Sequence, residues 1–439
     1  MIRSLKDCAN ILKMAYEGED VTIQGFDIDS RRIQPGQCFL ALDLARSGCE
    51  FVADAVDKGA VAVIASKPLS SHIPHLVVND VHKAMLILMK EVLNRSQAKR
   101  YAMTGSMGKT TTKNTLAHLL SHLGPTHATL GNLNNHFGVP VTLLNIQPQH
   151  QYVVIEMGAN QPGDIKQLVS YAKPHAVMIT GAAACHIEKL KNISGVIQEK
   201  GAICRYAPKD AWVYLPQQDQ GTSQWVKDAG QRKITYFGTD QTSFTCSLNE
   251  GELKTTWQGQ CVSIKTNIGV PHLINVMDFC VRVADHESMS LTDLQAVMVQ
   301  FPENIVRHRV VQCQNAMIID DTYNASPIAV KAMVDWVKSM QLKSLVVLGQ
   351  MAELGSQSGQ HHLDVAAHIA KQGLDCAFCG DDAAAVTQGH PYAFVAPHHN
   401  ALKRYLNQRW QDYDVILVKG SRSSRMEDVV TWMEGEIAV

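Results

Sequence analysis

The hydrophobic and polar positions of this chain follow two alternating patterns. Short apolar and β-branched runs, bounded by glycine, proline and polar residues, are typical of strands. Between them lie longer stretches in which apolar residues recur at helical spacing. Strands that alternate with helices form mostly parallel sheets. The pattern therefore predicts an α/β protein, and changes along the chain divide it into three blocks.

The first block, residues 1–98, is predicted to be a small α/β domain. Residues 1–16 are amphipathic and carry charges throughout, so we expect no signal peptide. The polar residues 94–100 are predicted to form a linker. The expected strands are residues 21–28, 38–42, 61–65 and 75–78, followed by a helix over residues 81–94.

The second block, residues 99–308, is predicted to be a mostly parallel sheet with helices on its faces. A short apolar strand, residues 101–104, precedes a glycine loop and a helix over residues 109–122. Further strands are expected at residues 152–155 and 176–180. Residues 212–266 contain short strand-like runs and turns.

The third block, residues 309–439, is predicted to be a second, smaller, Rossmann-like unit. Its expected strands are residues 316–319, 344–348, 376–378 and 415–418, with helices between them. The length of 439 residues agrees with about three domains at roughly 150 residues each.

Composition narrows the class of protein. The formal net charge of -1 provides no basic surface for nucleic acid, and no apolar run is long enough to cross a membrane. The eleven cysteines form no disulfide framework, and the pair Cys376 and Cys379 lacks the further ligands of a zinc site. We therefore expect a cytoplasmic protein that holds any anionic ligand in a local site.

The most specific local motif is a phosphate-binding loop. Residues 104–111 read TGSMGKTT, so a strand ends, two glycines let the backbone approach a phosphate, and a helix begins at Lys109. Lys109 is expected to contact the outer phosphates, and the Thr110 hydroxyl is expected to bind magnesium. Met103 stands where the common motif has its first glycine, so this loop is a shortened variant.

Chemically useful side chains follow four predicted strands. Glu156 follows residues 152–155, His186 follows residues 176–180, Asp321 follows residues 316–319, and Lys419 follows residues 415–418. Ligands of open α/β sheets gather at the carboxyl ends of strands. A carboxylate such as Glu156 beside Thr110 suits a hard cation. The four strand ends and the loop therefore predict one composite site between domains.

Seven motifs together resemble those of the Mur ligases, in order and over nearly the whole chain. Residues 104–113 (TGSMGKTTTK) are similar to that family's ATP loop, and residues 131–140 (GNLNNHFGVP) and 156–160 (EMGAN) to its next two signatures. Residues 351–355 (MAELG) and 419–422 (KGSR) match its C-terminal domain. Residues 321–327 (DTYNASP) resemble the member that adds D-alanyl-D-alanine. Residues 29–31 (DSR) resemble the domain that holds the UDP-sugar.

The resemblance implies an activity and three domains. These are a UDP-precursor-binding domain, a central ATP-binding domain and a Rossmann-like C-terminal ligase domain. The expected reaction joins D-alanyl-D-alanine to UDP-N-acetylmuramoyl-tripeptide through an acyl phosphate, with ATP and Mg²⁺. The third residue of the tripeptide, lysine or diaminopimelate, stays open. A monomer without nucleic-acid or membrane partners is expected.

The resemblance also assigns roles to individual residues. Catalytic roles fall on Lys109, His186 and Lys200, and Lys200 is expected to be carbamylated. The metal ligands are expected to be Thr110, Glu156, His186 and the Lys200 carbamate. The ATP contacts are expected to be Thr104, Gly105, Ser106, Met107, Gly108, Lys109, Thr110, Thr111, Asn275, Arg307 and Asp321. The other substrates are expected to contact Ser30, Arg31, Asn134, Asn135, Tyr323 and Asn324.

Several positions depart from the family pattern. Met107 stands in place of asparagine, Ala202 in place of glutamate, His272 in place of asparagine and Gln350 in place of aspartate. In the first block, residues 47–49 read SGC where the family has DGH. The nucleotide and metal core keeps its residues, so changes in specificity or activity are expected at the edges that face the substrates.

Two other readings stay open. One is a sister ligase that adds a different amino acid or uses a different acceptor, against which residues 321–327 argue. The other is a degenerate nucleotide-binding scaffold without catalysis. The presence of Lys109, Thr110, Glu156, His186 and Lys200 argues against a scaffold.

Overall fold

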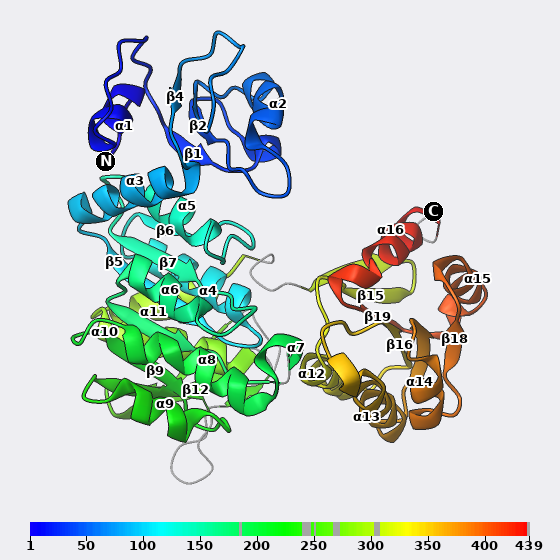
Figure 1. The fold of residues 1–439 in the computed structure, drawn as a ribbon. Helices are drawn as coiled ribbons and strands as arrows, with labels where there is room; N and C mark the ends of the chain where they lie inside the picture. The colour runs from blue at the N-terminus through cyan, green and yellow to red at the C-terminus, as the bar shows by residue number, and fades with distance from the viewer. Residues whose placement is uncertain (184–186, 239–246, 250–251, 267–272, 303–307, 437–439) are drawn as a thin grey trace.

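Three units follow one another along the chain (Figure 1). The computed structural model describes residues 1–183, 187–238, 247–249, 252–266, 273–302 and 308–436. The four sheets of the described chain lie one in the first unit, two in the second and one in the third. The fold is thus the α/β architecture that the hydrophobic pattern predicts. The exact domain boundaries at residues 98 and 308 stay a prediction.

The first unit is a four-stranded parallel sheet in the order β1-β2-β3-β4. The four predicted strands are present with shorter bounds, and β2 begins one residue before the predicted start. The helix α3 buries one apolar side and packs on α5 of the second unit. The elements are α1 (Leu5–Ile11), β1 (Gly25–Asp27), β2 (Gln37–Leu40), α2 (Val52–Asp57), β3 (Ala62–Ala65), β4 (His75–Val77) and α3 (Val81–Arg95).

The predicted linker over residues 94–100 is wrong. Asn94 and Arg95 belong to α3, and Lys99 and Arg100 already begin strand β5. Polar residues suit both places, since the end of the helix and the start of the strand reach the protein surface. The connection is therefore residues 96–98, and Ala98 is buried in the core that the two units share.

The main sheet of the second unit has six parallel strands in the order β10-β9-β8-β5-β7-β6. β5 lies in the middle, so the loop after it opens at the centre of the carboxyl edge. The elements are β5 (Lys99–Thr104), α4 (Lys109–Ser121), β6 (Thr126–Ala128), α5 (Gly138–Leu144), β7 (Tyr152–Glu156), α6 (Asp164–Ala172), β8 (Ala176–Ile179), α7 (Ile187–Leu190), α8 (Ile193–Tyr206), β9 (Trp212–Pro216), α9 (Thr222–Ala229) and β10 (Ile234–Phe237).

The strands of this sheet are buried on both faces. Along β5, Ala102 packs into one core, while its neighbours Tyr101 and Met103 pack into the other. Alternate side chains point to opposite faces of a strand, so both faces must be covered. A small antiparallel sheet and two helices complete the unit: β11 (Ser247–Asn249), β12 (Glu252–Trp257), β13 (Gln260–Lys265), α10 (Ile274–His286) and α11 (Leu291–Met298).

The third unit is a six-stranded sheet in the order β14-β15-β19-β16-β17-β18. All pairs are parallel except β14–β15, which the sequence pattern did not predict. The elements are β14 (Arg309–Cys313), β15 (Ala316–Asp321), α12 (Pro327–Ser339), β16 (Ser344–Gly349), α13 (Ser358–Lys371), β17 (Asp375–Cys379), α14 (Ala383–Gly389), β18 (Phe394–Ala396), α15 (His399–Arg409), β19 (Val415–Lys419) and α16 (Glu427–Glu436).

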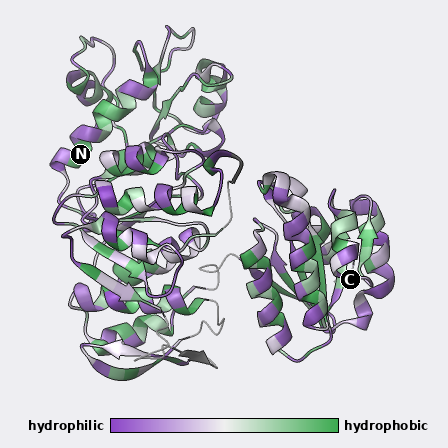
Figure 2. Cartoon of the chain, turned by 60° about the horizontal axis from the view of Figure 1, so that its bottom comes forward, coloured by the Kyte–Doolittle hydropathy of each residue, from purple (hydrophilic) through white to green (hydrophobic). Residues whose placement is uncertain are grey.

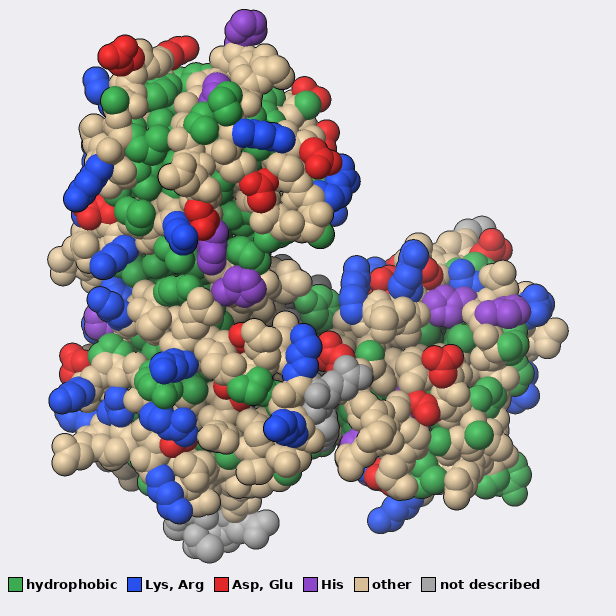
Figure 3. Space-filling model, viewed as in Figure 1, with side chains coloured by type: hydrophobic (Ala, Val, Ile, Leu, Met, Phe, Trp, Pro, Cys, Tyr) green, Lys and Arg blue, Asp and Glu red, His purple; other side chains and the backbone are tan. Residues whose placement is uncertain are grey.

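The apolar strands of the third unit lie between helices that turn polar residues outward (Figure 2). Cys376 and Cys379 lie on β17, as expected for residues of a strand, and both thiols are buried and free. On the face shown in Figure 3, acidic and basic side chains are interspersed, in agreement with the near-neutral charge. Within the described residues, no helix is both long and apolar enough to cross a membrane.

Candidate functional site

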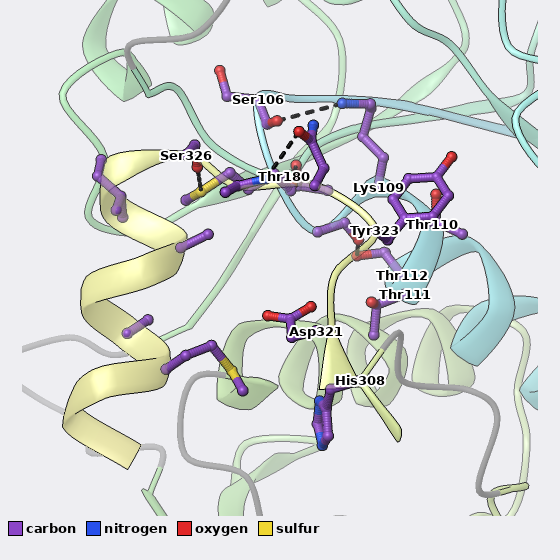
Figure 4. A pocket seen from close by; sticks show the side chains of 18 of the residues that line it. Ser106, Lys109, Thr110, Thr111, Thr112, Thr180, His308, Asp321, Tyr323 and Ser326 are labelled. Carbon is purple, nitrogen blue, oxygen red and sulfur yellow. Dashed lines mark hydrogen bonds between the residues drawn. The ribbon is translucent and has the colours of Figure 1, made fainter. Parts of the chain in front are cut away.

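A cleft of about 1180 Å³ lies between the second and third units. One wall is the loop after β5 with the start of α4, and the facing wall consists of the loops after β15, β16 and β19. All of these loops follow the carboxyl ends of parallel strands. Figure 4 shows side chains of both walls, among them Lys109, Thr110, Asp321 and Tyr323. Of the composite site that the sequence predicts, the phosphate loop, Asp321 and Lys419 line this cavity, Glu156 does not line it, and His186 lies outside the described residues.

Local geometry explains the two glycines of the phosphate loop. A Cβ atom on Gly105 would lie 1.8 Å from the Thr180 hydroxyl, and Gly108 has a left-handed φ of 74° where it caps α4. Both positions therefore need glycine. The Lys109 ammonium donates to the Gly105 carbonyl oxygen at 2.7 Å, which folds the side chain back over the loop. A phosphate in the loop would meet backbone N–H groups, the start of a helix and this ammonium group.

The candidate metal site centres on Glu156, which is 1% exposed at the end of β7. Its carboxylate accepts hydrogen bonds from the Thr110 hydroxyl at 2.7 Å and the Asn134 amide at 2.8 Å. The Thr110 hydroxyl and the Asn134 amide are both neutral donors. A hydroxyl and a carboxylate in contact, beside a phosphate loop, fit Mg²⁺, which prefers a few oxygen ligands and keeps several waters. Thr110 and Glu156 are thus brought together as predicted.

The facing wall is organised by a buried lysine. The Lys419 ammonium, 3% exposed, donates to an Asp321 carboxylate oxygen at 2.5 Å and to the Asn324 carbonyl oxygen at 2.9 Å. Ser421 connects two further loops, because its hydroxyl accepts from the Ala352 N–H at 2.8 Å and donates to the Ala325 carbonyl oxygen at 3.3 Å. Three loops that are distant in the sequence therefore form one wall.

Contacts across the cleft join the walls. Ser326, at the start of α12, donates a hydrogen bond to the Met107 sulfur at 3.0 Å, as Figure 4 shows. On the other side of the phosphate loop, the Thr180 hydroxyl donates to the Met107 carbonyl oxygen. Met107, one of the departures from the family pattern, thus contacts the C-terminal unit through its side chain while its backbone keeps the loop conformation.

Polar and apolar side chains both line the cleft. Besides the phosphate loop, the lining includes the apolar residues Met178, Phe237, Val276, Ile328 and Met333. His308 also lines the cleft, and burial lowers the pKa of its imidazole, which favours the neutral form. Sequence analysis missed Thr180, His308 and Ser326. The signal for Thr180 is its place at the end of β8; no local motif marks His308.

Most of the other predicted site residues in the second and third units line the cleft, and a few lie behind it. Ser106, Met107, Gly108, Thr111, Asn275, Tyr323 and Asn324 line the cleft, as do Lys109, Thr110 and Asp321. Thr104 lies behind the loop, where its hydroxyl donates to the Met157 carbonyl oxygen. The Asn135 side chain accepts from the N–H groups of Phe137 and Gly138 at the start of α5. Gly105 shapes the loop from behind.

Ser30 and Arg31 lie in the first unit, away from the cleft lining. Arg31 forms an exposed ion pair with Asp29 at 2.8 Å, and Ser30 is buried. Lys200 is on α8 and only 1% exposed. Its neighbour Glu199 accepts from the N–H groups of Gly163 and Ile165, at 2.8 Å each, and so anchors α8 to the start of α6. His186, Arg307 and His272 lie outside the described residues.

Comparison with known proteins identifies the family. Residues 103–277 match the Mur ligase middle domain, and residues 306–422 match the Mur ligase, glutamate ligase domain. The UDP-N-acetylmuramoyl-tripeptide–D-alanyl-D-alanine ligase of Escherichia coli (strain K12) is 32% identical over 442 residues, 97% of each chain. The ligase of that name from Haemophilus influenzae is 30% identical over 463 residues, 98% of each chain.

The fold agrees with this relationship. A crystal structure of MurF from Acinetobacter baumannii superposes with a TM-score of 0.87 at 27% identity and covers 99% of both chains. Similarity thus extends over all three units and over the cleft between the second and the third. The chain belongs to the Mur ligase family.

Proposed function

We propose that this protein is an ATP-dependent ligase that adds D-alanyl-D-alanine to UDP-N-acetylmuramoyl-tripeptide in peptidoglycan precursor synthesis. The observation that carries the proposal is the cleft whose lining combines the phosphate loop, Thr110 in contact with Glu156, and the Asp321–Lys419 pair. The names of the relatives, which align over 97% of the chain, support the choice of substrates.

The cleft suits ATP in one orientation. The triphosphate would lie at the phosphate loop, where N–H groups and Lys109 offset its negative charge. Apolar lining residues such as Phe237, Val276 and Ile328 suit the flat face of a purine. Thr110 and Glu156 would hold Mg²⁺, which when bound neutralises phosphoryl charge.

The reaction follows from the weakness of a carboxylate as an electrophile. A carboxylate oxygen of the tripeptide attacks the γ-phosphorus, and the bond to the β-phosphate oxygen breaks to give an acyl phosphate and ADP. The amine of the dipeptide then attacks the acyl carbon and loses a proton, and the tetrahedral intermediate expels phosphate. The protein's own groups position these reactants and balance charge, so little covalent chemistry is required of them.

Carbamylation of Lys200 belongs to the proposal. Carbamate formation requires a neutral amine, and burial favours the neutral form of a lysine. Labelling with ¹³C-bicarbonate and recording the carbonyl NMR signal tests it directly. We expect a carbamate signal that Lys200→Ala removes, and a wild-type protein without that signal contradicts this part of the proposal.

The decisive experiment is an omission assay with purified protein, ATP, Mg²⁺, D-alanyl-D-alanine and a UDP-N-acetylmuramoyl-tripeptide that ends in lysine or in diaminopimelate. We expect phosphate release and a nucleotide product heavier by the dipeptide only when all components are present. Lys109→Met, which keeps length but removes charge, is expected to lower turnover roughly 10²–10³-fold. Turnover with a different amine but not with D-alanyl-D-alanine would favour a sister ligase. ATP binding without any turnover would favour a scaffold.

A further inference from the structure

A hydrogen-bonded cluster lies directly behind the wall that the C-terminal unit contributes to the cleft. Its members are Gln350 after β16, Ser358 and His362 on α13, and Asp382 before α14. The His362 side chain is completely buried, and Asp382 is 21% exposed. None of the four lines the cleft. Their positions between the core and the loop after β16 call for an explanation.

His362 holds the backbone of this loop as a neutral acceptor. The Met351 N–H donates to His362 Nε2 at 3.0 Å, so Nε2 carries no proton. The proton is therefore on Nδ1, and this nitrogen lies 2.9 Å from the Ser358 carbonyl oxygen and 3.0 Å from an Asp382 carboxylate oxygen. Burial lowers the pKa of His362, which agrees with the neutral ring. Met351 is buried, so its N–H depends on this acceptor.

Gln350 uses both ends of its amide. Its Nε2 donates to Asp382 Oδ2 at 2.6 Å, and its Oε1 accepts from the Asp381 N–H at 3.0 Å. Ser358 also donates to Asp382 Oδ2. A carboxylate at position 350 would place two negative charges against each other here. The cluster therefore accommodates one carboxylate, and in this chain Asp382 supplies it.

The loop that the cluster holds lines the cleft. Ala352, Glu353 and Leu354 belong to the cleft wall. From the cleft side, Ser421 donates its N–H to the Gln350 carbonyl oxygen at 3.1 Å, and its hydroxyl accepts from the Ala352 N–H. Residues 350–354 are thus fixed from the front by Ser421 and from behind by His362 and Asp382.

We propose that Gln350, His362 and Asp382 are positioning residues for the nucleotide, because they lock residues 351–354 in the conformation that lines the cleft. The inference rests on the proposed binding of ATP there. Gln350, His362 and Asp382 do not line the cleft and act only through the loop. Their substitution is therefore expected to change the KM for ATP more than kcat.

The first test compares substitutions of two buried histidines. His362→Leu removes the acceptor of the Met351 N–H and is expected to raise the KM for ATP about tenfold. His362→Gln, whose amide oxygen restores an acceptor, is expected to keep the KM within about threefold. The control is His390→Leu, since His390 is buried in the same unit but bonds to the Leu374 carbonyl oxygen.

Thermal unfolding of each variant separates positioning from stability. If His390→Leu lowers Tm as much as His362→Leu but leaves the KM for ATP unchanged, positioning is supported. If the two variants behave alike in both measurements, His362 is merely structural and the inference is overturned. Wild-type protein that binds no ATP would instead overturn the proposed function.

The second test exchanges the amide and the carboxylate and conserves side-chain volume. Gln350→Glu places a carboxylate against Asp382 and is expected to raise the KM for ATP about tenfold. Adding Asp382→Asn restores a pair with one carboxylate and is expected to recover most of that loss. A double variant whose KM for ATP is as high as that of Gln350→Glu alone would overturn the inference. This test does not depend on whether His362→Leu folds.

Discussion

Two buried carboxylates at opposite edges of the central sheet have opposite environments. Glu156, at the carboxyl edge, accepts hydrogen bonds from the neutral side chains of Thr110 and Asn134. Glu287, at the amino edge, has a side chain only 3% exposed and forms an ion pair with Lys99 at 2.7 Å. It also accepts from the hydroxyl groups of Tyr101 and Tyr152.

The difference shows how one residue type serves two purposes. At Glu287 the negative charge is balanced within the protein, so the group stabilises the fold and offers nothing to a ligand. At Glu156 the partners in the described chain supply hydrogen bonds without positive charge, and the cost of a buried charge is offset when a cation binds. A buried carboxylate that accepts from a hydroxyl and an amide beside a phosphate loop is therefore the more informative sign of a site.

The largest expected effect is a loss of turnover when the charge of Glu156 is removed. Glu156→Gln keeps the hydrogen bond from Thr110 but removes the charge, and we expect turnover to fall roughly 10²–10³-fold because a metal ligand is lost. Tm should stay within a few degrees of wild type. Steady-state kinetics over a range of Mg²⁺ concentrations checks the prediction, and a variant with normal turnover and normal Mg²⁺ dependence would contradict it.

Across the cleft, Asp321 and Lys419 combine both roles, because the pair is internal and also lines the site. Lys419→Met leaves a partly buried Asp321 carboxylate, 14% exposed, without its cation. We expect a loss of about 3 kcal/mol in the free energy of unfolding together with a higher KM for ATP. Urea denaturation and kinetics measure the two. Lys419→Arg is the matched control, and equal behaviour of both variants would show that the charge is unimportant.

Glu287→Gln tests whether Glu287 contributes to stability alone. The tyrosine hydroxyl groups keep an acceptor, but the ion pair with Lys99 is lost, and Lys99 is 55% exposed. We therefore expect a loss of about 1 kcal/mol in the free energy of unfolding and unchanged turnover. Turnover and urea denaturation of Glu287→Gln are measured in parallel with those of Glu156→Gln. A large loss of activity in Glu287→Gln would contradict the assignment of Glu287 to stability alone.

The smallest expected effect is the pH dependence of the stability that Glu287 contributes. Burial alone would raise the pKa of Glu287, but hydrogen bonds from Lys99, Tyr101 and Tyr152 outweigh burial and the net pKa is lowered. A lowered pKa means that the stabilisation is present above the unfolded-state pKa of about 4.3 and is lost as pH falls through the folded-state value. The stability gap between wild type and Glu287→Gln should therefore narrow between about pH 5 and pH 3, as urea denaturation will show.

The phosphate loop and the facing wall differ in how well the sequence predicts them. Gly105, Gly108, Lys109 and Thr110 lie within six consecutive positions, and their conformation depends on a strand end and a helix start. The facing wall needs residues 321–326, 350–354 and 419–423 to meet. Ser421 forms that junction, yet nothing in its local sequence indicates which loops it joins.

Sequence alone determined the α/β class, the phosphate loop and the polar groups at strand ends, because each depends on neighbours within a few positions. Tertiary structure decided which carboxylates carry internal counter-charges, how Thr110 meets Glu156, and which loops close the cleft. Asn134 approaches Glu156, and Lys419 approaches Asp321, only after strands distant in the sequence become neighbours in a sheet. Long-range pairing sets these contacts, and local patterns carry no record of it.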